Sequence, residues 1–346
     1  MWNVISNYPH HRSPYFSALD RAFAVENIES RHFPELKSAL NSNGVISLHR
    51  LQRLYRDENG PNPALLNNSL QLLSLARQRG LKLAWTVHNL LPIYGEEPTS
   101  LDRQCMQHVL DLSDMVICHT HADAGSIRQL APRANVSVSG SAGLWMEETE
   151  HDTSLEPLLC AMDDCEQAFL AFGHITAYKD LLRVGRTFLQ CTNNATLFIV
   201  GEARDSSLLG SLRDLQAASG GRLMLWPLRV DPSEAHRLYR RAAVAVCSYL
   251  TTGRYAYFRD VLHPSSISTA RGFNVPVITP DLPATRELAV GVAAVFYASD
   301  VESSADLGAA LRLAETRFRE PSYSSGTARD EWIQIARFYK EIEPLL

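Results

Sequence analysis

The sequence is short of the features that mark the best-known nucleotide-binding and hydrolytic proteins. It contains no Gly-x-Gly-x-x-Gly, no Gly-x-x-x-x-Gly-Lys-Ser/Thr and no Gly-x-Ser-x-Gly motif. These absences argue against a dinucleotide-dependent redox enzyme, a P-loop NTPase and a hydrolase with a serine nucleophile elbow. No apolar run approaches the roughly 20 residues of a transmembrane helix, so we expect no transmembrane segment.

Excess positive charge is also missing. The chain has 33 Lys and Arg against 38 Asp and Glu, which gives a net charge of −5 and a pI of about 6.2. A nucleic-acid-binding protein would need a basic stripe to neutralise phosphates, so we expect no nucleic-acid partner. Lysine is scarce, which makes each of the four lysines conspicuous: Lys37, Lys82, Lys179 and Lys340.

Metal-binding patterns are not apparent in the sequence either. The six cysteines form no Cys-x-x-Cys pair, no Asp-x-Asp occurs, and no histidine or cysteine cluster has ligand spacing. We therefore predict no metal ion and no cofactor. The first residues become polar too early for a signal peptide, so we expect a cytoplasmic protein, with peripheral membrane contact left open.

What the sequence does contain is an alternation of short apolar runs with longer amphipathic stretches. The runs predict strands at residues 3–6, 45–49, 83–88, 115–119, 169–172, 196–200, 223–227, 244–248 and 275–279. Helical patterns lie between them at residues 15–24, 64–79, 100–112, 181–191, 206–218, 232–241, 265–273 and 305–318. Strands separated by helices need crossover connections, which predicts parallel sheets.

This pattern predicts the α/β class with two doubly wound, Rossmann-like domains that face each other across a cleft. The first domain is expected over residues 1–150 and the second over 167–325, with an acidic linker at 151–166. A last amphipathic helix within residues 326–346 is expected to pack back on the first domain. Ligands of such sheets bind beyond the carboxyl ends of the strands, so site residues should directly follow strands.

Two segments of the second half could bind phosphates. Gly173 and His174 follow a predicted strand, and Lys179 then stands at the start of a helix, where backbone N–H groups also favour an anion. A solvated lysine is the competing interpretation. His263, Ser265 and Ser266 open another helix after a proline-containing turn and predict a second anion cradle, although simple N-capping accounts equally well for the serines.

Other candidates are weaker. His88 ends a first-domain strand before a proline-containing loop, so it is a candidate general base, with Glu96 and Glu97 as alternatives. A polar and aromatic segment after the first strand predicts acceptor contacts, or a structural turn, at His10, His11, Arg12 and Tyr15. Nucleotide or sugar contacts are predicted at Gly201, Tyr249, Tyr255 and Tyr257.

In their order along the chain, these motifs resemble glycosyltransferases of the GT-B fold. They are Thr-Val-His-Asn-Leu-Leu-Pro at 86–92, Phe-Gly-His-Ile-x-x-Tyr-Lys at 172–179, Leu-Phe-Ile-Val-Gly at 197–201 and a serine-rich turn before Val-Pro-Val-Ile. The pattern is similar to bacterial GDP-mannose:glycolipid β-mannosyltransferases of xanthan-type polysaccharide synthesis and related family-4-like glycosyltransferases. The resemblance implies that Lys179 and the turn at Ser265–Ser266 hold the donor diphosphate and that His88 faces the reacting sugar.

The chain departs from this superfamily at two places. An arginine that often precedes the Tyr-Lys motif is replaced by His174 or Thr176, and the helix near Thr269 lacks the carboxylate of the retaining branch. The resemblance implies transfer from a nucleotide-diphosphate sugar, with a GDP-sugar favoured. The missing carboxylate favours inversion, and the missing metal-binding patterns favour a metal-independent reaction. The acceptor is a small molecule with a hydroxyl or thiol, or a lipid-linked saccharide. An epimerase, a pseudo-glycosyltransferase and a noncatalytic nucleotide-sugar-binding protein remain alternatives.

Overall fold

The computed structural model describes residues 1–6, 13–93, 97–145, 152–299, 304–324 and 326–346. The chain forms two compact units. The first comprises Met1–Ser141, Tyr257–His263 and Arg329–Leu346, and the second comprises Ala142–Ala256 and Pro264–Ala328. The N- and C-terminal segments therefore fold together, and the middle of the chain forms the second unit.

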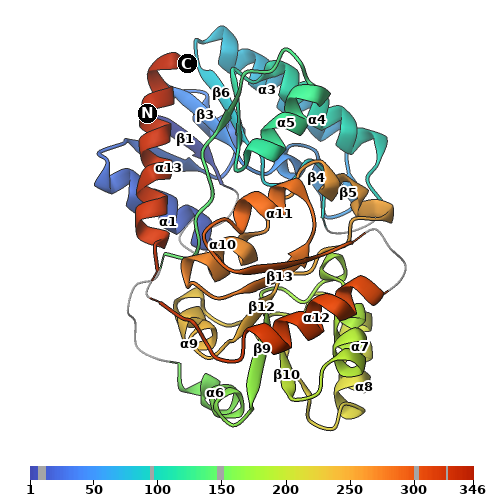
Figure 1. Ribbon diagram of the computed structural model, residues 1–346. Helices are drawn as coiled ribbons and strands as arrows, with labels where there is room; N and C mark the ends of the chain where they lie inside the picture. The colour runs from blue at the N-terminus through green and yellow to red at the C-terminus, as the bar shows by residue number, and fades with distance from the viewer. Residues whose placement is uncertain (7–12, 94–96, 146–151, 300–303, 325) are drawn as a thin grey trace. The chain divides into compact units, whose positions relative to one another are not determined.

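The first unit is built on a six-stranded parallel sheet with the order β2-β1-β3-β6-β7-β8 (Figure 1). Its strands are β1 (Trp2–Ile5), β2 (Ser30–Phe33), β3 (Val45–Leu48), β6 (Lys82–Thr86), β7 (Met115–Cys118) and β8 (Val136–Val138). Its helices are α1 (Pro14–Val25), α2 (Leu36–Ala39), α3 (Pro63–Gln78), α4 (Ser100–Leu112), α5 (His121–Leu130) and α13 (Ala328–Ile342). The two short strands β4 (Arg56–Asp57) and β5 (Gly60–Pro61) form an antiparallel pair beside this sheet.

The second unit repeats the plan, with a parallel sheet of order β11-β10-β9-β12-β13-β14. Its strands are β9 (Gln167–Phe172), β10 (Ala195–Val200), β11 (Leu223–Trp226), β12 (Val244–Val246), β13 (Val277–Pro280) and β14 (Ala294–Tyr297). Its helices are α6 (Glu156–Asp163), α7 (Leu181–Cys191), α8 (Ser206–Ala217), α9 (Ala235–Tyr239), α10 (Ser265–Gly272), α11 (Pro283–Leu288) and α12 (Ala305–Arg317). Two parallel sheets with interleaved helices confirm the predicted fold class.

Local chemistry explains where the helices start. Asn62 caps α3 by accepting from the backbone N–H of Ala64, and Pro63 occupies the first helical position, where its missing N–H costs nothing. Helix α4 begins with a capping box between Thr99 and Asp102. The carboxylate of Asp102 also accepts from Tyr55 Oη at 2.5 Å and from the guanidinium of Arg56 at 2.9 Å. One buried carboxylate thus joins α4 to the segment before β5.

The apolar stripes of the helices cover the sheets. In the second unit, Leu181, Val184 and Phe188 of α7 are fully buried against the strand residues Phe169 and Leu197. Full burial of such side chains contributes about 1.5–3 kcal/mol each. The central strands β9 and β10 are buried on both sides, as expected for parallel sheets.

The acidic segment expected as a linker has structure of its own. Its second part forms the helix α6 in the second unit, and the buried residues Leu155, Leu158, Leu159 and Met162 anchor it. The acidic residues Glu156 and Asp163 lie on its outside and bind arginines of the same unit, Arg237 and Arg241. In this segment the acidic residues therefore lie on the solvent-exposed face of a helix, and the apolar residues pack that helix onto the second unit.

Helix α13 belongs to the first unit (Figure 1). Tyr339 donates or accepts a hydrogen bond of 2.9 Å with Thr86 Oγ1, at the end of β6, and packs edge-on against Trp2. Trp332 of the same helix is buried. Helix α13 thus contributes Tyr339 and Trp332 to the core of the first unit, together with residues such as Trp2 from the start of the chain.

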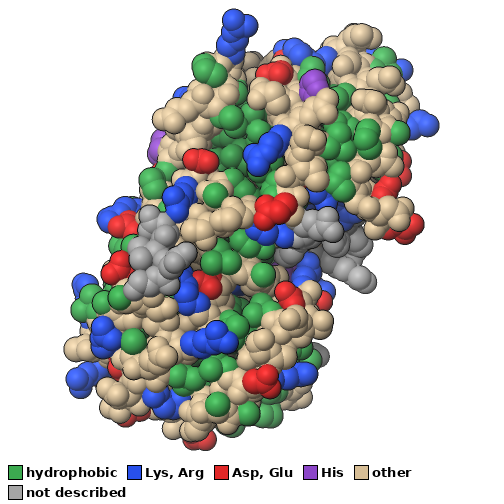
Figure 2. Space-filling model, turned by 90° about the vertical axis from the view of Figure 1, so that its right-hand side faces the viewer, with side chains coloured by type: hydrophobic (Ala, Val, Ile, Leu, Met, Phe, Trp, Pro, Cys, Tyr) green, Lys and Arg blue, Asp and Glu red, His purple; other side chains and the backbone are tan. Residues whose placement is uncertain are grey.

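The surface carries both signs of charge. On the face in Figure 2, Lys and Arg side chains are interspersed with Asp and Glu side chains. Among the described residues, no helix is long and apolar enough to span a membrane.

Candidate active site

Three strands of the first sheet are followed by histidines. His49 comes directly after β3, His119 directly after β7, and His88 two residues after the end of β6. These three strands are neighbours, and parallel strands end at the same edge of a sheet. The sheet therefore brings the three imidazoles together at its carboxyl edge.

The histidines form a continuous chain of hydrogen bonds. Ser47 Oγ lies 3.1 Å from His49 Nε2, and His49 Nδ1 lies 3.1 Å from His88 Nε2. His88 Nδ1 lies 3.3 Å from His119 Nε2, and His119 Nδ1 lies 3.0 Å from the carbonyl oxygen of Gly140.

The carbonyl at the end of this chain determines its direction. A carbonyl oxygen only accepts, so the neutral His119 carries its proton on Nδ1 and accepts at Nε2. His88 must then donate from Nδ1 and accept at Nε2, and the same holds for His49, which accepts from the hydroxyl of Ser47. Both ring nitrogens of His88 are therefore engaged.

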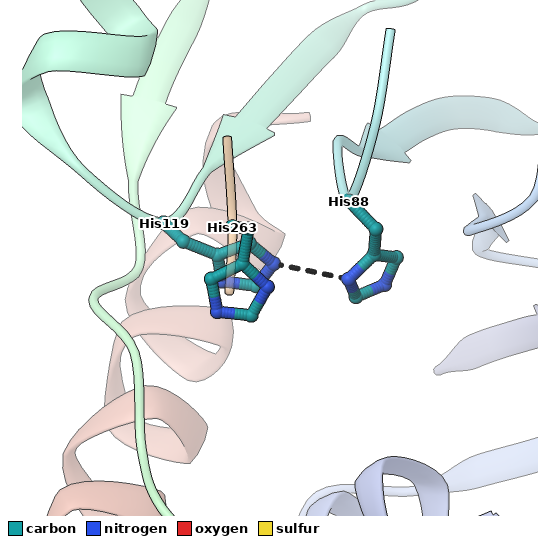
Figure 3. Close-up of side chains that lie close together, drawn as sticks. All are labelled: His88, His119 and His263. Carbon is teal, nitrogen blue, oxygen red and sulfur yellow. Dashed lines mark hydrogen bonds between the residues drawn. The ribbon is translucent and has the colours of Figure 1, made fainter. Parts of the chain in front are cut away.

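A fourth histidine, His263, joins the cluster from the loop after η6 (Gly253–Arg259). Its ring stacks on that of His119, with ring centroids 3.6 Å apart and an interplanar angle of 19° (Figure 3). Its Nε2 lies 2.8 Å from Ser141 Oγ. One nitrogen from each of His88, His119 and His263 lies within 4.8 Å of the other two, which is close enough for the three to hold a metal ion.

Burial keeps His49, His88 and His119 uncharged near neutral pH. Desolvation lowers the pKa of His88 well below its usual 6.5, and repulsion from His119, His49 and His263 adds to this effect. Burial likewise lowers the pKa of His49 to about 3 and that of His119 to about 4. The imidazoles are thus neutral at pH 7 and offer lone pairs rather than positive charge.

Two aromatic residues lie against the cluster. Tyr15 of α1 packs edge-on against His88, with ring centroids 4.7 Å apart, and against Trp332 of α13 at 5.2 Å. Of the residues predicted to contact an acceptor, Tyr15 is thus beside His88. His10, His11 and Arg12, and Glu96 among the candidate bases, lie outside the described residues; Glu97 is exposed.

In the second unit, the predicted diphosphate residues gather after β9. Gly173 has φ +104°, which favours glycine, and a Cβ there would lie 2.9 Å from Lys179 Nζ. Lys179 ends the short turn η4 (Ala177–Lys179) and donates to the carbonyl oxygen of Phe172 at 2.9 Å. Desolvation lowers the pKa of Lys179 to about 8.

This site lies where the order of the second sheet reverses. From β9 the chain runs outward through β10 and β11, and it then returns to the other side of β9 with β12. Ser248, which follows β12, donates to the carbonyl oxygen of Lys179. Such a reversal point is where open α/β sheets bind their ligands.

The predicted serine turn and the aromatic residues pack around the same edge. Ser266, at the start of α10, lies 2.5 Å from the hydroxyl of Tyr249, and Tyr249 stacks on Tyr178. Tyr255 meets Tyr178 edge-on, and Ser265 is exposed at the first position of α10. Ser266 and Tyr249 are thus joined to each other, and Tyr178 is the aromatic residue between Tyr249 and Tyr255.

Three further predicted residues have the following surroundings. Gly201 has φ +142°, and a Cβ there would lie 2.3 Å from the carbonyl oxygen of Gly173, so glycine is needed for this close approach. Tyr257 is buried in the first unit and donates to the carbonyl oxygens of Leu91 and Pro92 at 3.2 Å. His174 is partly exposed and lies 3.4 Å from Glu202 Oε2.

Sequence reasoning selected His88 but missed its partners His49 and His119. The signal was available, because each of three apolar runs ends in a histidine and neighbouring parallel strands share an edge. The sequence groups His263 with the predicted diphosphate residues because it lies two residues before Ser265. The structure places it in the first unit beside His119.

Together, these features define a two-domain α/β protein of the GT-B fold, with candidate ligand residues at the carboxyl edge of each sheet. No protein-family model and no curated protein sequence matches the chain.

Solved structures do match it. Sucrose-phosphate synthase from Thermosynechococcus elongatus has a TM-score of 0.67 at 14% identity and covers 100% of this chain and 99% of that chain. HepE from Anabaena, in complex with UDP and glucose, has a TM-score of 0.65 at 14% identity and covers 100% of both chains. Trehalose-6-phosphate synthase from Burkholderia multivorans has a TM-score of 0.56 at 10% identity and covers 96% of this chain and 75% of that chain. At such identities the likeness establishes the fold.

Proposed function

We propose that the protein is a glycosyltransferase that moves a sugar from a nucleotide-diphosphate donor to an acceptor. Two things support this proposal. The fold is shared with a sucrose-phosphate synthase, a trehalose-6-phosphate synthase and a UDP-bound HepE. The second unit also presents a lysine at the reversal point of its sheet.

The arrangement around Lys179 is the observation that carries the proposal. An ammonium group has three N–H donors, and Lys179 uses one of them for the carbonyl of Phe172. Gly173 leaves the space beside Nζ free of a side chain. A desolvated cation with remaining donors suits the diphosphate of a nucleotide-sugar, since the leaving group gains charge as the glycosidic bond breaks. In this proposal the diphosphate is neutralised without a metal ion.

The proposal also names the donor, the stereochemistry and the acceptor. The sequence motifs favour a GDP-sugar, whereas the structures of HepE make a UDP-sugar the alternative to test. Inverting transfer is proposed because Ser268, Thr269 and Ala270 of α10 supply no carboxylate. The acceptor is a small molecule with a hydroxyl or thiol, or a lipid-linked saccharide.

On the acceptor side we propose the histidine chain rather than His88 alone as the proton acceptor. A general base needs a lone pair within reach of the acceptor, and both nitrogens of His88 are hydrogen bonded to other histidines. His88 therefore accepts a proton only when one of these bonds opens. If the chain acts as a unit, His88→Ala and His49→Ala should each reduce turnover with a hydroxyl acceptor by about 100-fold or more, and the double variant should lose little more.

A direct test begins with donor binding. Thermal unfolding is measured with GDP, UDP and dTDP, because a ligand at 100 times its dissociation constant stabilises the folded state by about 2.7 kcal/mol. The nucleotide that raises Tm is then tested as its sugar conjugate, with sugar transfer and nucleotide release followed together. Binding of none of the three nucleotides would refute the proposal. Binding without transfer or hydrolysis would point to a noncatalytic nucleotide-sugar-binding protein.

A further inference from the structure

We infer that His88, His119 and His263 form a binding site for a divalent transition-metal ion of the zinc type. All three histidines belong to the first unit, and one nitrogen from each lies within 4.8 Å of the other two. Figure 3 shows His88 directed at His119, with the ring of His263 stacked on that of His119. The inference does not depend on the proposed transferase activity.

The spacing of the first two histidines already suits a shared ion. His88 Nδ1 and His119 Nε2 are 3.3 Å apart. Two ligands about 2.0–2.1 Å from a tetrahedral zinc ion lie about 3.3–3.4 Å from each other. The ion would replace the proton that His88 now shares with His119.

Each of the three rings also has an outer partner on its other nitrogen. His119 Nδ1 bonds the carbonyl of Gly140, His88 Nε2 faces His49 Nδ1, and His263 Nε2 faces Ser141 Oγ. Such partners fix the orientation of ligating histidines in metal sites. They point to His119 Nε2 and His88 Nδ1 as the ligand atoms of these two rings, and His263 supplies the third ligand.

The three imidazole ligands determine which kind of metal ion the site would bind. Imidazole suits zinc, copper, nickel and iron, whereas magnesium and calcium prefer oxygen ligands. Neutral imidazole is the form that binds metal. Three protein ligands leave one tetrahedral position for water or a ligand molecule.

The stacking of His263 on His119 predicts unequal contributions. An ion must lie near the plane of each ring that binds it, and two nearly parallel rings 3.6 Å apart cannot both meet this condition. His263 therefore has to rotate away from His119 to become the third ligand. His119→Ala should abolish binding, while His263→Ala should leave a weaker two-histidine site.

Binding must also reverse the hydrogen-bond chain. Once His88 Nδ1 holds an ion, its proton resides on Nε2 and is donated to His49 Nδ1. His49 then carries its own proton on Nε2 and donates it to Ser47 Oγ, which can accept. Two histidines thus change tautomer with no net release of a proton.

The experiment titrates the full chain with Co²⁺, followed by visible absorption, and measures bound Co²⁺ and Zn²⁺ per chain after dialysis. We expect one ion per chain and no binding to His119→Ala. Loss of the outer partner in His49→Ala should weaken affinity by about 10- to 100-fold, and the control His108→Ala on α4 should bind normally. In ¹⁵N spectra of the wild type, Zn²⁺ should switch His49 and His88 from the Nδ1–H to the Nε2–H form.

Wild-type protein that takes up no Co²⁺, or whose uptake and tautomers are the same in His119→Ala, would overturn the inference. The wild-type measurements decide the matter even if a variant fails to fold. Nucleotide binding is measured separately, so a chain that binds UDP or GDP but no cobalt would retain the proposed function and lose only the metal site.

Discussion

The lysine of the second unit gives the sharpest prediction, because its charge should be lost within an accessible range of pH. Desolvation lowers the pKa of Lys179 from 10.5 to about 8. A diphosphate binds the charged form, so nucleotide affinity should fall as the pH rises through about 8. With this pKa, the charged fraction drops from about 0.9 at pH 7 to about 0.1 at pH 9, which corresponds to a loss of about tenfold in affinity.

The neighbouring groups do not titrate in this range. Burial raises the pKa of Cys247 to about 11, and desolvation lowers that of His174 to about 4, with the charges of Arg204 and Lys179 adding to the effect. Both residues are thus neutral between pH 7 and pH 9. The terminal phosphate, whose second pKa is about 6, is fully ionised over most of this range.

Isothermal titration with the nucleotide that stabilises the protein, at pH 7, 8 and 9, measures this effect. Lys179→Met should weaken binding at pH 7 by about 1.5–3 kcal/mol, or about 10- to 150-fold, and should remove the dependence on pH. The exposed lysine of α2 provides the control, since Lys37→Met should behave like the wild type. Wild-type affinity that is flat from pH 7 to pH 9, or a pH slope that survives in Lys179→Met, would refute the reasoning.

Three further predictions concern stability and the shape of the site. Trp332→Ala should lower the free energy of unfolding by about 3–5 kcal/mol in denaturant titrations, because a buried aromatic ring of α13 is lost; an effect below 1 kcal/mol would contradict this packing. Asp102→Ala should lower the free energy of unfolding by about 3–5 kcal/mol, because it leaves Arg56 without its carboxylate partner. In the double variant, Arg56→Met should restore part of that free energy. Gly201→Ala should lower the free energy of unfolding by about 1–3 kcal/mol and weaken nucleotide binding, because the new Cβ displaces Gly173. A wild-type stability together with a wild-type nucleotide affinity would contradict this prediction.

The central elements of both sheets could be predicted from the sequence because they are buried on both faces. A strand such as β10 reads as an unbroken apolar run, and helix α7 begins and ends where its apolar stripe predicts. The strands that were not predicted include β2, β8 and β14, which lie at the edges of the sheets. The edge strands β2 and β8 are less buried and keep polar residues, so they lack a clear apolar run. Strand β14 is an apolar run of only four residues, Ala-Val-Phe-Tyr, in which alternate residues are partly exposed.

Site residues could be grouped from the sequence only where they lie on one strand and the loop that follows it. Gly173 and Lys179 lie on one such connection, and the structure keeps them together. The link between His88 and His119 depends on the order of β6 and β7 in the sheet, and the position of His263 depends on a return of the chain to the first unit. A local sequence pattern shows neither the order of the strands nor the return of the chain. No spacing rule groups three histidines that are so far apart in the sequence.

The division of the chain between the two units determines the order in which they can be completed during synthesis. The second unit has all its residues once Ala328 has been made, although it begins only at Ala142. The first unit lacks α13, whose Tyr339 and Trp332 fill its core, until residues 328–342 have been made. At about 5–20 residues per second, its N-terminal part waits about 10–40 s for the helix that covers it. During that interval an apolar surface of the first sheet is exposed, so a chain without α13 should be a target for chaperones and proteases. The second unit has all of its residues only near the end of the interval.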